Sequence, residues 1–244
     1  MGKVYAIRKA GNIENKIVGT WNECSAIVKG VKGAKYKSFL SIGEAEEYLK
    51  AGSKSLLKSD NKHPKDCLHI YVDGSYDAKS GMASSGIVYV ENDVVVDIGS
   101  GRVEPENTEG MRQVTGELYA VMQALINSYM NGEKKVVIFY DYEGVCAHAT
   151  GEWKANSAFA QNYQKAVKSY AKIMDITFVK VDSHTGDLYN EIADDICKSV
   201  IGIPSTRKVH SLLTTEKLKT SSKEVFEVFD SLGYIKEDTN VQLV

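Results

Sequence analysis

Two aspartates stand at the ends of two predicted core strands. Asp73 closes the strand Leu68–Asp73, before a predicted turn at 74–76, and Asp141 directly follows the apolar run 136–140. A single Asp at such a position is most simply explained by a turn that its own side chain caps. The repeated arrangement favours instead two carboxylates that point into one site.

Two further acids complete a candidate metal site. Glu117 lies early in the predicted helix 112–131, after Gly116, which allows close approach of the backbone to a neighbouring strand or ligand. Asp194 lies in a predicted helix that starts at Leu188. Glu117 alone would be an ordinary surface residue. Four converging carboxylates, however, would hold two divalent cations about 4 Å apart, one activating water and one stabilising the leaving oxygen of a phosphoryl displacement.

A histidine belongs to the same set of candidates. His184 lies in the polar loop 182–187, where a lone histidine is usually a surface residue. Beside a carboxylate cluster it would serve as a proton shuttle, since its ordinary pKa is close to neutral pH. Asp195 competes with Asp194 for the fourth metal position, and the spacing from Asn190 and Glu191 favours Asp194.

The composition indicates a globular protein with a real core. The chain has 244 residues, of which 43% are hydrophobic and 25% charged. No apolar run approaches the roughly 18 residues of a membrane span, and no secretory signal is visible, so we expect a cytoplasmic protein. The four cysteines are scattered without zinc spacing, which predicts reduced thiols.

The positive charge is concentrated at the front of the chain. Residues 1–60 hold eleven Lys or Arg against six Asp or Glu, although the net charge of the whole chain is −2. This stretch predicts three strands and two helices, with capping boxes at Thr20–Glu23 and Ser41–Glu44. The charge split suggests phosphate attraction here and cation binding in the acidic remainder.

Aromatic residues lie close to lysines within this basic unit. A domain of about fifty residues needs aromatic side chains for its core, which is one explanation. The other is a surface that stacks on sugars or bases while lysines neutralise phosphates. The residues of this candidate surface are Tyr5, Trp21, Lys35, Tyr36 and Lys37.

The remaining chain alternates strands and helices. Residues 53–66 are polar and predict a flexible linker. Strands are predicted at 85–90, 94–99 and 176–181, and helices at 143–150 and 157–174. The tail 204–244 contains a capping box at 221–224 that opens a short helix, which we expect to pack on the preceding body.

The front segment resembles the hybrid-binding, or viroplasmin-like, domain found at the N-terminus of many type I ribonucleases H. The resemblance rests on the order and spacing of four segments, YAIR, TWNEC, AKYKSF and the helix at Glu44. In that family these aromatics and lysines contact an RNA/DNA hybrid, which implies Tyr5, Trp21, Tyr36 and Lys37 here. Ser38 stands where a second lysine is usual.

The body resembles the catalytic domain of type I ribonuclease H over residues 67–201. The matching segments are Asp73-Gly74-Ser75, TGEL, the aspartate after IFY, and SHTGD leading to NEIAD. The resemblance implies that the metal-binding acids are Asp73, Glu117, Asp141 and Asp194, with His184 as the loop histidine. Gln113 and Val114 replace paired asparagines that contact RNA in many relatives. The segment 147–164 also lacks the basic cluster that grips substrate in some relatives, so binding would depend more on the front unit.

The sequence therefore predicts an α/β chain with a ribonuclease H-like mixed five-stranded sheet flanked by helices, preceded by a small α+β domain. We expect a hybrid-binding domain at 1–52, a linker at 53–66, a catalytic domain at 67–203 and an extension at 204–244. The predicted activity is hydrolysis of the RNA strand of RNA/DNA hybrids with two Mg²⁺ or Mn²⁺ ions, giving 5′-phosphates. We expect a monomer that does not bind membranes, with double-stranded RNA as a second candidate ligand. The alternatives are a non-catalytic binder of hybrids or double-stranded RNA, and another nuclease of the same fold.

Overall fold

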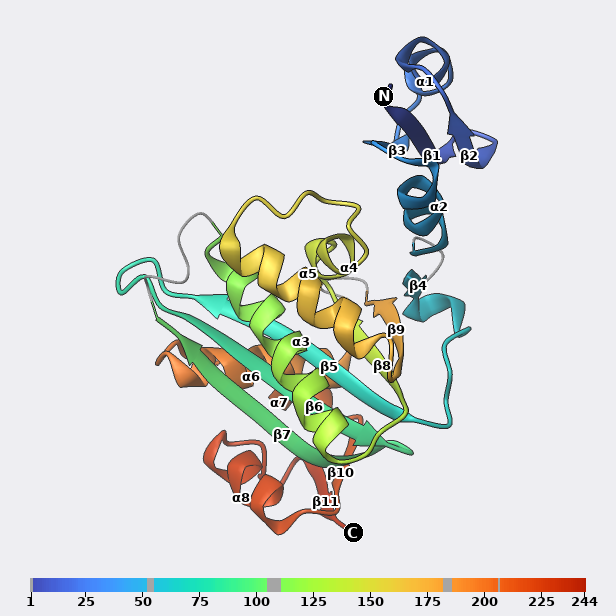
Figure 1. Cartoon of the computed structure of the whole chain (residues 1–244). Helices are drawn as coiled ribbons and strands as arrows, with labels where there is room; N and C mark the ends of the chain where they lie inside the picture. The colour runs from blue at the N-terminus through green and yellow to red at the C-terminus, as the bar shows by residue number, and fades with distance from the viewer. Residues whose placement is uncertain (1, 52–54, 105–110, 182–185, 206) are drawn as a thin grey trace.

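The computed structural model describes residues 2–51, 55–104, 111–181, 186–205 and 207–244. Its strands form a small and a large sheet (Figure 1). We call residues 2–51 the front domain and residues 55–244 the large domain. The fold class predicted from the sequence, a ribonuclease H-like α/β body behind a small α+β domain, is confirmed.

The front domain is built on one central strand. The sheet order is β2-β1-β3, and consecutive residues of β1 bury against opposite helices: Ile7 packs with α1 residues and Ala6 with α2 residues. Both predicted capping boxes are present, at Thr20 with Glu23 and at Ser41 with Glu44. The elements are β1 (Val4–Ala10), β2 (Ile13–Val18), α1 (Trp21–Val28), β3 (Lys35–Phe39) and α2 (Ile42–Ala51).

The large sheet contains the five expected strands at its centre. Their order is β7-β6-β5-β8-β9, with β5, β6 and β7 antiparallel and β5, β8 and β9 parallel. The bounds are β5 (Leu68–Tyr76), β6 (Ala83–Glu91), β7 (Val94–Val103), β8 (Lys135–Tyr140) and β9 (Asp175–Lys180). The described residues add three further strands: β4 beside β9, and β10 and β11 beyond β7.

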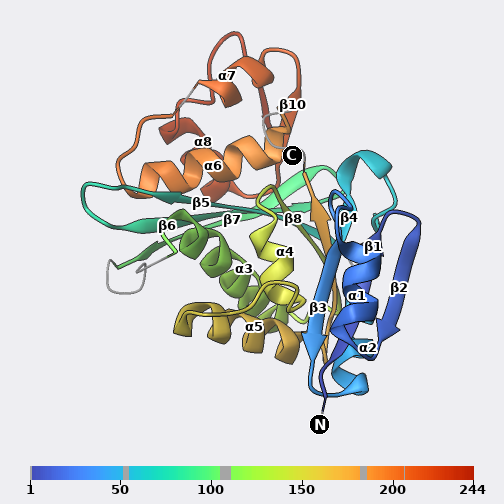
Figure 2. The same ribbon diagram turned by 90° about the horizontal axis from the view of Figure 1, so that it is seen from above.

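Helices cover both faces of this sheet (Figure 2). Val72 packs in the hydrophobic cluster that contains residues of α3 and α5, whereas Tyr71 packs in the cluster that contains residues of α6 and the tail. Strand β5 is therefore buried on both sides, which holds it rigid at the centre of the molecule. The helices are α3 (Gln113–Met130), α4 (Gly144–Ala149), α5 (Ala158–Tyr170) and α6 (Leu188–Val200).

The predicted turn at 74–76 is wrong. Strand β5 continues to Tyr76 because its antiparallel pairing with β6 persists through Gly74, Ser75 and Tyr76. The chain turns instead at Asp77, whose carboxylate accepts hydrogen bonds from the N–H groups of Lys79 and Ser80. Asp73 consequently lies within a paired strand rather than at its end.

The prediction of a flexible linker is wrong for residues 55–66. Strand β4 (Ser55–Leu57) pairs in parallel with β9, and a 3₁₀ turn follows at Lys58–Asp60. Leu56 packs in the core beside Val179, and His63 is buried. The polar residues around Leu56 conceal this strand in the sequence, since its partner lies more than a hundred residues away.

The tail packs on the rest of the large domain, as expected, and also extends its sheet. It forms α7 (Lys208–Leu213), β10 (Lys217–Thr220), α8 (Lys223–Ser231) and β11 (Asn240–Leu243). Phe229 and Tyr234 are buried in the cluster shared with α6. The expected capping box at 221–224 is displaced: Ser222 is the N-cap, and its hydroxyl accepts from the N–H of Val225.

Candidate active site

Asp73 and Asp141 come together through the register of two parallel strands. The last paired residues of β5 and β8 are Tyr71 and Phe139, and each aspartate follows two residues later. The two residues therefore occupy equivalent positions where the strands part. Strand β8 ends at Tyr140, whereas β5 continues paired with β6, so β5 and β8 no longer pair with each other at the two aspartates.

Glu117 reaches the two aspartates from the first turns of α3. A side chain on Gly116 would place its Cβ 2.2 Å from the carbonyl oxygen of Ser84 and 3.0 Å from the Cα of Gly74. Only glycine allows the helix to approach the β5–β6 pair this closely, as the sequence suggested for Gly116. Glu117 is thereby buried beside Asp73, with 6% of its surface exposed.

Asp194 approaches from α6 by a comparable close contact. A Cβ on Gly86 would lie 2.0 Å from the carbonyl oxygen of Ala193, so α6 crosses β6 backbone against backbone. Gly86 is the residue that pairs with Asp73 in the β5–β6 ladder. The contact at Gly86 therefore places Asp194, the next residue after Ala193, beside Asp73.

Asp73 is common to two groups of potential ligands. In one group, ligand atoms of Asp73, Glu117 and Asp141 all lie within 4.8 Å of one another, and in the other those of Asp73, Asp194 and Cys197 do so. The structure thus brings the other three predicted acids, Glu117, Asp141 and Asp194, around Asp73.

Cys197 was not among the predicted site residues. Its position three residues after Asp194 places both on one helix face, which is the signal that could have identified it. Its thiol donates to the carbonyl oxygen of Asp194 at 3.1 Å. Burial, together with the charges of Asp73 and Asp194, raises the pKa of the Cys197 thiol well above its ordinary value, so the sulfur stays protonated. A protonated thiol is a poor ligand, which leaves carboxylate oxygens as the donors.

The buried acids hold their protons tightly without cations. Burial, then the charges of Asp141 and Asp194, raises the pKa of Asp73 well above its ordinary value, although the N–H of Gly74 donates to its Oδ1 at 2.7 Å. Burial and the charges of Asp73 and Asp141 likewise raise the pKa of Glu117. Carboxylates that are costly to ionise together have the chemistry of a site for divalent cations, whose charge offsets the repulsion.

Lys198 is a second neighbour that sequence reasoning missed. Its Nζ lies 2.5 Å from Oδ2 of Asp194, one helical turn away on α6. Burial alone would lower the pKa of Lys198, but its hydrogen bond to Asp194 and the charge of that residue raise it. The ammonium therefore stays charged and orients the Asp194 carboxylate.

Asp195 has a different role from its neighbour. Its Oδ2 accepts hydrogen bonds from the hydroxyls of Ser205 at 2.8 Å and Tyr234 at 3.1 Å. Asp195 is almost fully buried and connects α6 to the tail. The ambiguity between the two acids is thus resolved geometrically, because only Asp194 belongs to a group around Asp73.

Three predicted substrate-binding aromatics form a continuous surface on the front domain. The ring centroids of Tyr5 and Trp21 are 5.6 Å apart, and those of Trp21 and Tyr36 are 5.9 Å apart. Trp21 and Tyr36 are 48% and 41% exposed, so these two side chains lie outside the domain core. An exposed aromatic surface of this kind can stack on bases or sugars.

The two predicted lysines contact the large domain, although Lys35 remains exposed to solvent. Lys35 forms ion pairs with Glu143 at 3.1 Å and Glu152 at 3.4 Å, and the ammonium of Lys37 donates to the carbonyl oxygen of Gly151. The carboxylates outweigh the effect of burial and raise the pKa of Lys35.

Two predicted site residues cannot be placed. His184 lies outside the described residues. Gln113 is the first residue of α3, and its side chain is outside the described part of the structure.

Two family models match the chain. Residues 3–49 match the Ribonuclease H1 N-terminal domain, and residues 65–201 match RNase H. A search of curated proteins found no match. No helix in the described part of the chain is long and apolar enough to cross a membrane.

Solved structures of ribonucleases H resemble part of the chain. RNase H1 from the archaeon Halobacterium salinarum is 22% identical with a TM-score of 0.47, covering 55% of this chain and 97% of that one. The N-terminal RNase H domain of a Mycobacterium tuberculosis protein is 16% identical, with a TM-score of 0.46 and coverage of 55% and 96%. LC11-RNase H1, solved in complex with RNA/DNA hybrid, is 16% identical, with a TM-score of 0.45 and coverage of 55% and 99%.

The RNase H family match alone spans more than half of the 244 residues and includes Asp73 and the three acids around it. This chain therefore belongs to the RNase H family.

Proposed function

We propose that this protein is an endoribonuclease that hydrolyses the RNA strand of RNA/DNA hybrids with two divalent metal ions, Mg²⁺ or Mn²⁺. The observation that carries the proposal is the position of Asp73 in both groups of converging ligands. A carboxylate shared in this way is suited to bridge two cations. The family match and the front domain are consistent with a nucleic acid as the substrate.

The residues around Asp73 fit hard divalent cations. Their donors are carboxylate oxygens, which Mg²⁺ and Mn²⁺ prefer. Glu117 and Asp141 would complete one site with Asp73, and Asp194 would complete the other. When bound, the two cations would lower the pKa of an attacking water and stabilise the leaving oxygen. The resemblance to type I ribonucleases H implies products with 5′-phosphate and 3′-hydroxyl ends.

The protein itself would prepare the site through position and charge. Asp73 is fixed on a strand buried on both faces, and Glu117 is fixed by the close contact at Gly116. Lys198 contacts Oδ2 of Asp194 and so restrains this carboxylate beside Asp73. Such rigidity reduces the reorganisation that binding and reaction would require. His184 stays a prediction as the residue that assists proton transfer.

The front domain would supply much of the affinity for the hybrid. Its exposed aromatic surface offers stacking faces, and Lys35 would bind phosphate in competition with Glu143 and Glu152. Gln113 stays a prediction as a contact to the RNA strand. The monomeric state and the cytoplasmic location also stay predictions from the sequence.

Cleavage of strand-labelled substrates would test this function. RNA/DNA hybrid, double-stranded RNA and double-stranded DNA would each be incubated with Mg²⁺, Mn²⁺ or chelator. We expect cuts only in the RNA strand of the hybrid, and only with a divalent ion. Tight hybrid binding without any cleavage would instead identify a non-catalytic binding protein, and cleavage of double-stranded DNA would identify a different nuclease activity.

A further inference from the structure

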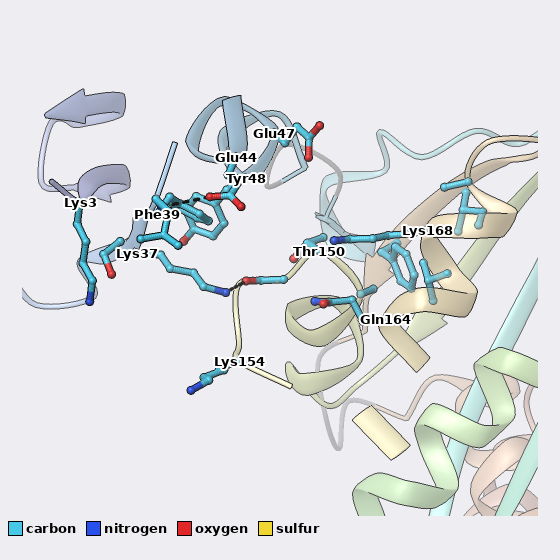
Figure 3. Close-up of a pocket in the computed structure, with 18 residues that line it drawn as sticks. Lys3, Lys37, Phe39, Glu44, Glu47, Tyr48, Thr150, Lys154, Gln164 and Lys168 are labelled. Atoms are coloured by element: carbon cyan, nitrogen blue, oxygen red, sulfur yellow. Dashed lines mark hydrogen bonds between the residues drawn. The ribbon is translucent and has the colours of Figure 1, made fainter. Parts of the chain in front are cut away.

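A cleft separates part of the front domain from the large domain (Figure 3). Its volume is about 870 Å³, within the range of roughly 300–1,000 Å³ typical of small-molecule sites. Strand β3 and helix α2 form one wall, and the end of α4, helix α5 and strand β9 form the other. The cleft is separate from the carboxylate site, because neither Asp73 nor any of the three acids around it lines the cleft.

Four lysines border this cleft from both sides. Lys3 and Lys37 belong to the front domain, and Lys154 and Lys168 belong to the large domain (Figure 3). The ion pairs that the described residues form across this interface use Arg8 and Lys35, and leave Lys3, Lys154 and Lys168 without a carboxylate partner. Burial, followed by the charges of Lys168 and Arg8, lowers the pKa of Lys37, as expected for cations that face one another. The glutamates of the lining, Glu44 and Glu47, are fewer than the lysines.

The floor of the cleft is apolar and partly aromatic. Phe39 and Val167 face it from opposite domains, and Phe39 packs on Tyr48 with ring centroids 5.2 Å apart. The ammonium of Lys37 lies 5.9 Å from the centroid of the Phe39 ring. An aromatic face beside a cluster of ammonium groups suits a ligand that has both a planar apolar part and an anionic part.

The two walls are fastened to each other next to the cleft. Nη1 of Arg8 lies 2.6 Å from Oε2 of Glu152, and the two side chains are only 10% and 17% exposed. The guanidinium of Arg8 also lies over the ring of Tyr48, at 3.9 Å. With the contacts of Lys35 and Lys37, these interactions hold the cleft in shape before any ligand enters, which lowers the entropic cost of binding.

We propose that this cleft is a nucleotide-binding site distinct from the carboxylate site. The base packs against Phe39, and the phosphate binds Lys37, Lys154 and Lys168. Inorganic phosphate would leave the apolar floor unused, and a nucleoside would leave the lysines unused, so the full nucleotide uses the site best. The nucleotide comes either from a free mononucleotide or from one unit of a nucleic-acid strand. Both sources share the chemistry that the cleft recognises.

Equilibrium binding to the full chain in chelator tests this proposal. Chelator prevents divalent ions from attracting phosphate to the carboxylate site. The probes are adenosine 5′-monophosphate, adenosine, inorganic phosphate and a short single-stranded DNA. We expect a nucleotide-containing probe to bind more tightly than adenosine or phosphate. Lys168→Glu and Lys154→Glu should each weaken binding about tenfold, since each removes a charge-assisted contact and adds repulsion.

The matched control is Lys172→Glu, an exposed lysine just beyond α5 that does not line the cleft. It should leave nucleotide affinity unchanged. If Lys168→Glu and Lys154→Glu weaken the binding of adenosine 5′-monophosphate, the ligand is a free nucleotide. If they weaken the binding of the single-stranded DNA and adenosine 5′-monophosphate does not bind, the ligand is a nucleic-acid strand. The proposal is overturned if no probe binds, if the cleft variants bind like the control, or if phosphate binds as tightly as the nucleotide. Hybrid cleavage is measured separately, so its loss or retention does not decide this result.

Discussion

Nζ of Lys35 lies 3.1 Å from Oε1 of Glu143, so a cation of the front domain pairs with an acid two residues beyond Asp141. Lys35 also contacts Glu152, which in turn pairs with Arg8. The sequence assigned Lys35 to phosphate binding, yet in this arrangement carboxylates of the large domain already neutralise it. Nucleic-acid phosphates must therefore compete with these carboxylates for the same cation.

Removing the charge of Glu152 should strengthen hybrid binding. Glu152→Gln frees Lys35 and Arg8 from one carboxylate, and we expect affinity for a labelled hybrid to rise about two- to tenfold in chelator. Fluorescence anisotropy would measure the affinity, and the gain should shrink at high salt because the freed charges are screened. Glu227→Gln, in an exposed ion pair of α8 with Lys223, is the control. Equal or weaker hybrid binding by Glu152→Gln would contradict this competition.

The same variant should bind nucleotides in the cleft less well, because it loosens one wall.

Asp73→Asn should separate binding from cleavage. We expect the rate of hybrid cleavage to fall by about 10³-fold or more, since bound cations contribute several kcal/mol to such reactions and Asp73 is shared by both groups. Hybrid affinity in chelator should be retained. Thermal stability in chelator should rise, because the change removes a buried carboxylate beside Asp141 and Asp194. The control is Asp175→Asn, exposed at the start of β9. Metal-dependent cleavage at the parent rate would refute the metal role of Asp73.

The positions of Asp73 and Asp141 could be anticipated because a local pattern marks where β5 and β8 stop pairing with each other. Asp73 and Asp141 each follow a run of apolar residues, and parallel strands align such ends without any knowledge of the contacts. Gly116 indicated a close approach of the backbone to a neighbouring strand, which the structure shows, and it directly precedes Glu117. The fold of the front domain could also be predicted from the sequence, since its capping boxes mark where the helices start.

The contacts between distant segments could not be anticipated in the same way. Strand β4 is a strand because β9 lies beside it, and β10 pairs with β7 although the two strands are far apart in the chain. The ion pair between Lys35 and Glu143 depends on how the two domains contact each other. The hydrophobic periodicity of the sequence carries no information about that contact. The contact of Lys198 with Asp194, in contrast, could have been predicted from the sequence, since Lys198 lies four residues after Asp194 on one helix.

The stability of the metal-free protein should fall as pH rises from the acidic range. The ordinary pKa values of Asp73 and Glu117 are 3.8 and 4.5, and both are raised well above these values in the folded chain. The unfolded chain therefore releases these protons first, so their contribution is fully present below the ordinary values and is lost as pH rises through the raised ones. Comparing melting temperatures of the parent and Glu117→Gln across pH in chelator isolates this contribution. The variant should lose less stability with rising pH, and saturating Mg²⁺ should reduce the difference. If the melting temperatures of the parent and Glu117→Gln changed in parallel with pH in chelator, the raised pKa of Glu117 would be disproved.

Gly86→Ala should disturb the site through the backbone rather than through chemistry. The new methyl group would lie 2.0 Å from the carbonyl oxygen of Ala193 and 2.9 Å from the backbone nitrogen of Cys197. Because both atoms belong to the main chain of α6, the helix must move away from β6, which should cost about 1–3 kcal/mol of unfolding free energy. Urea unfolding would measure this cost.

The displacement of α6 should also weaken cation binding, because Asp194 moves with the helix while Asp73 remains on β5. Titration of Mg²⁺ against thermal stability would detect the weaker binding. Gly99→Ala is the matched control in the same sheet, since its methyl group would meet only the Ile87 side chain, at 3.3 Å and beyond. If Gly86→Ala proved as stable and as responsive to Mg²⁺ as Gly99→Ala, the close approach of α6 to β6 would not be what positions Asp194.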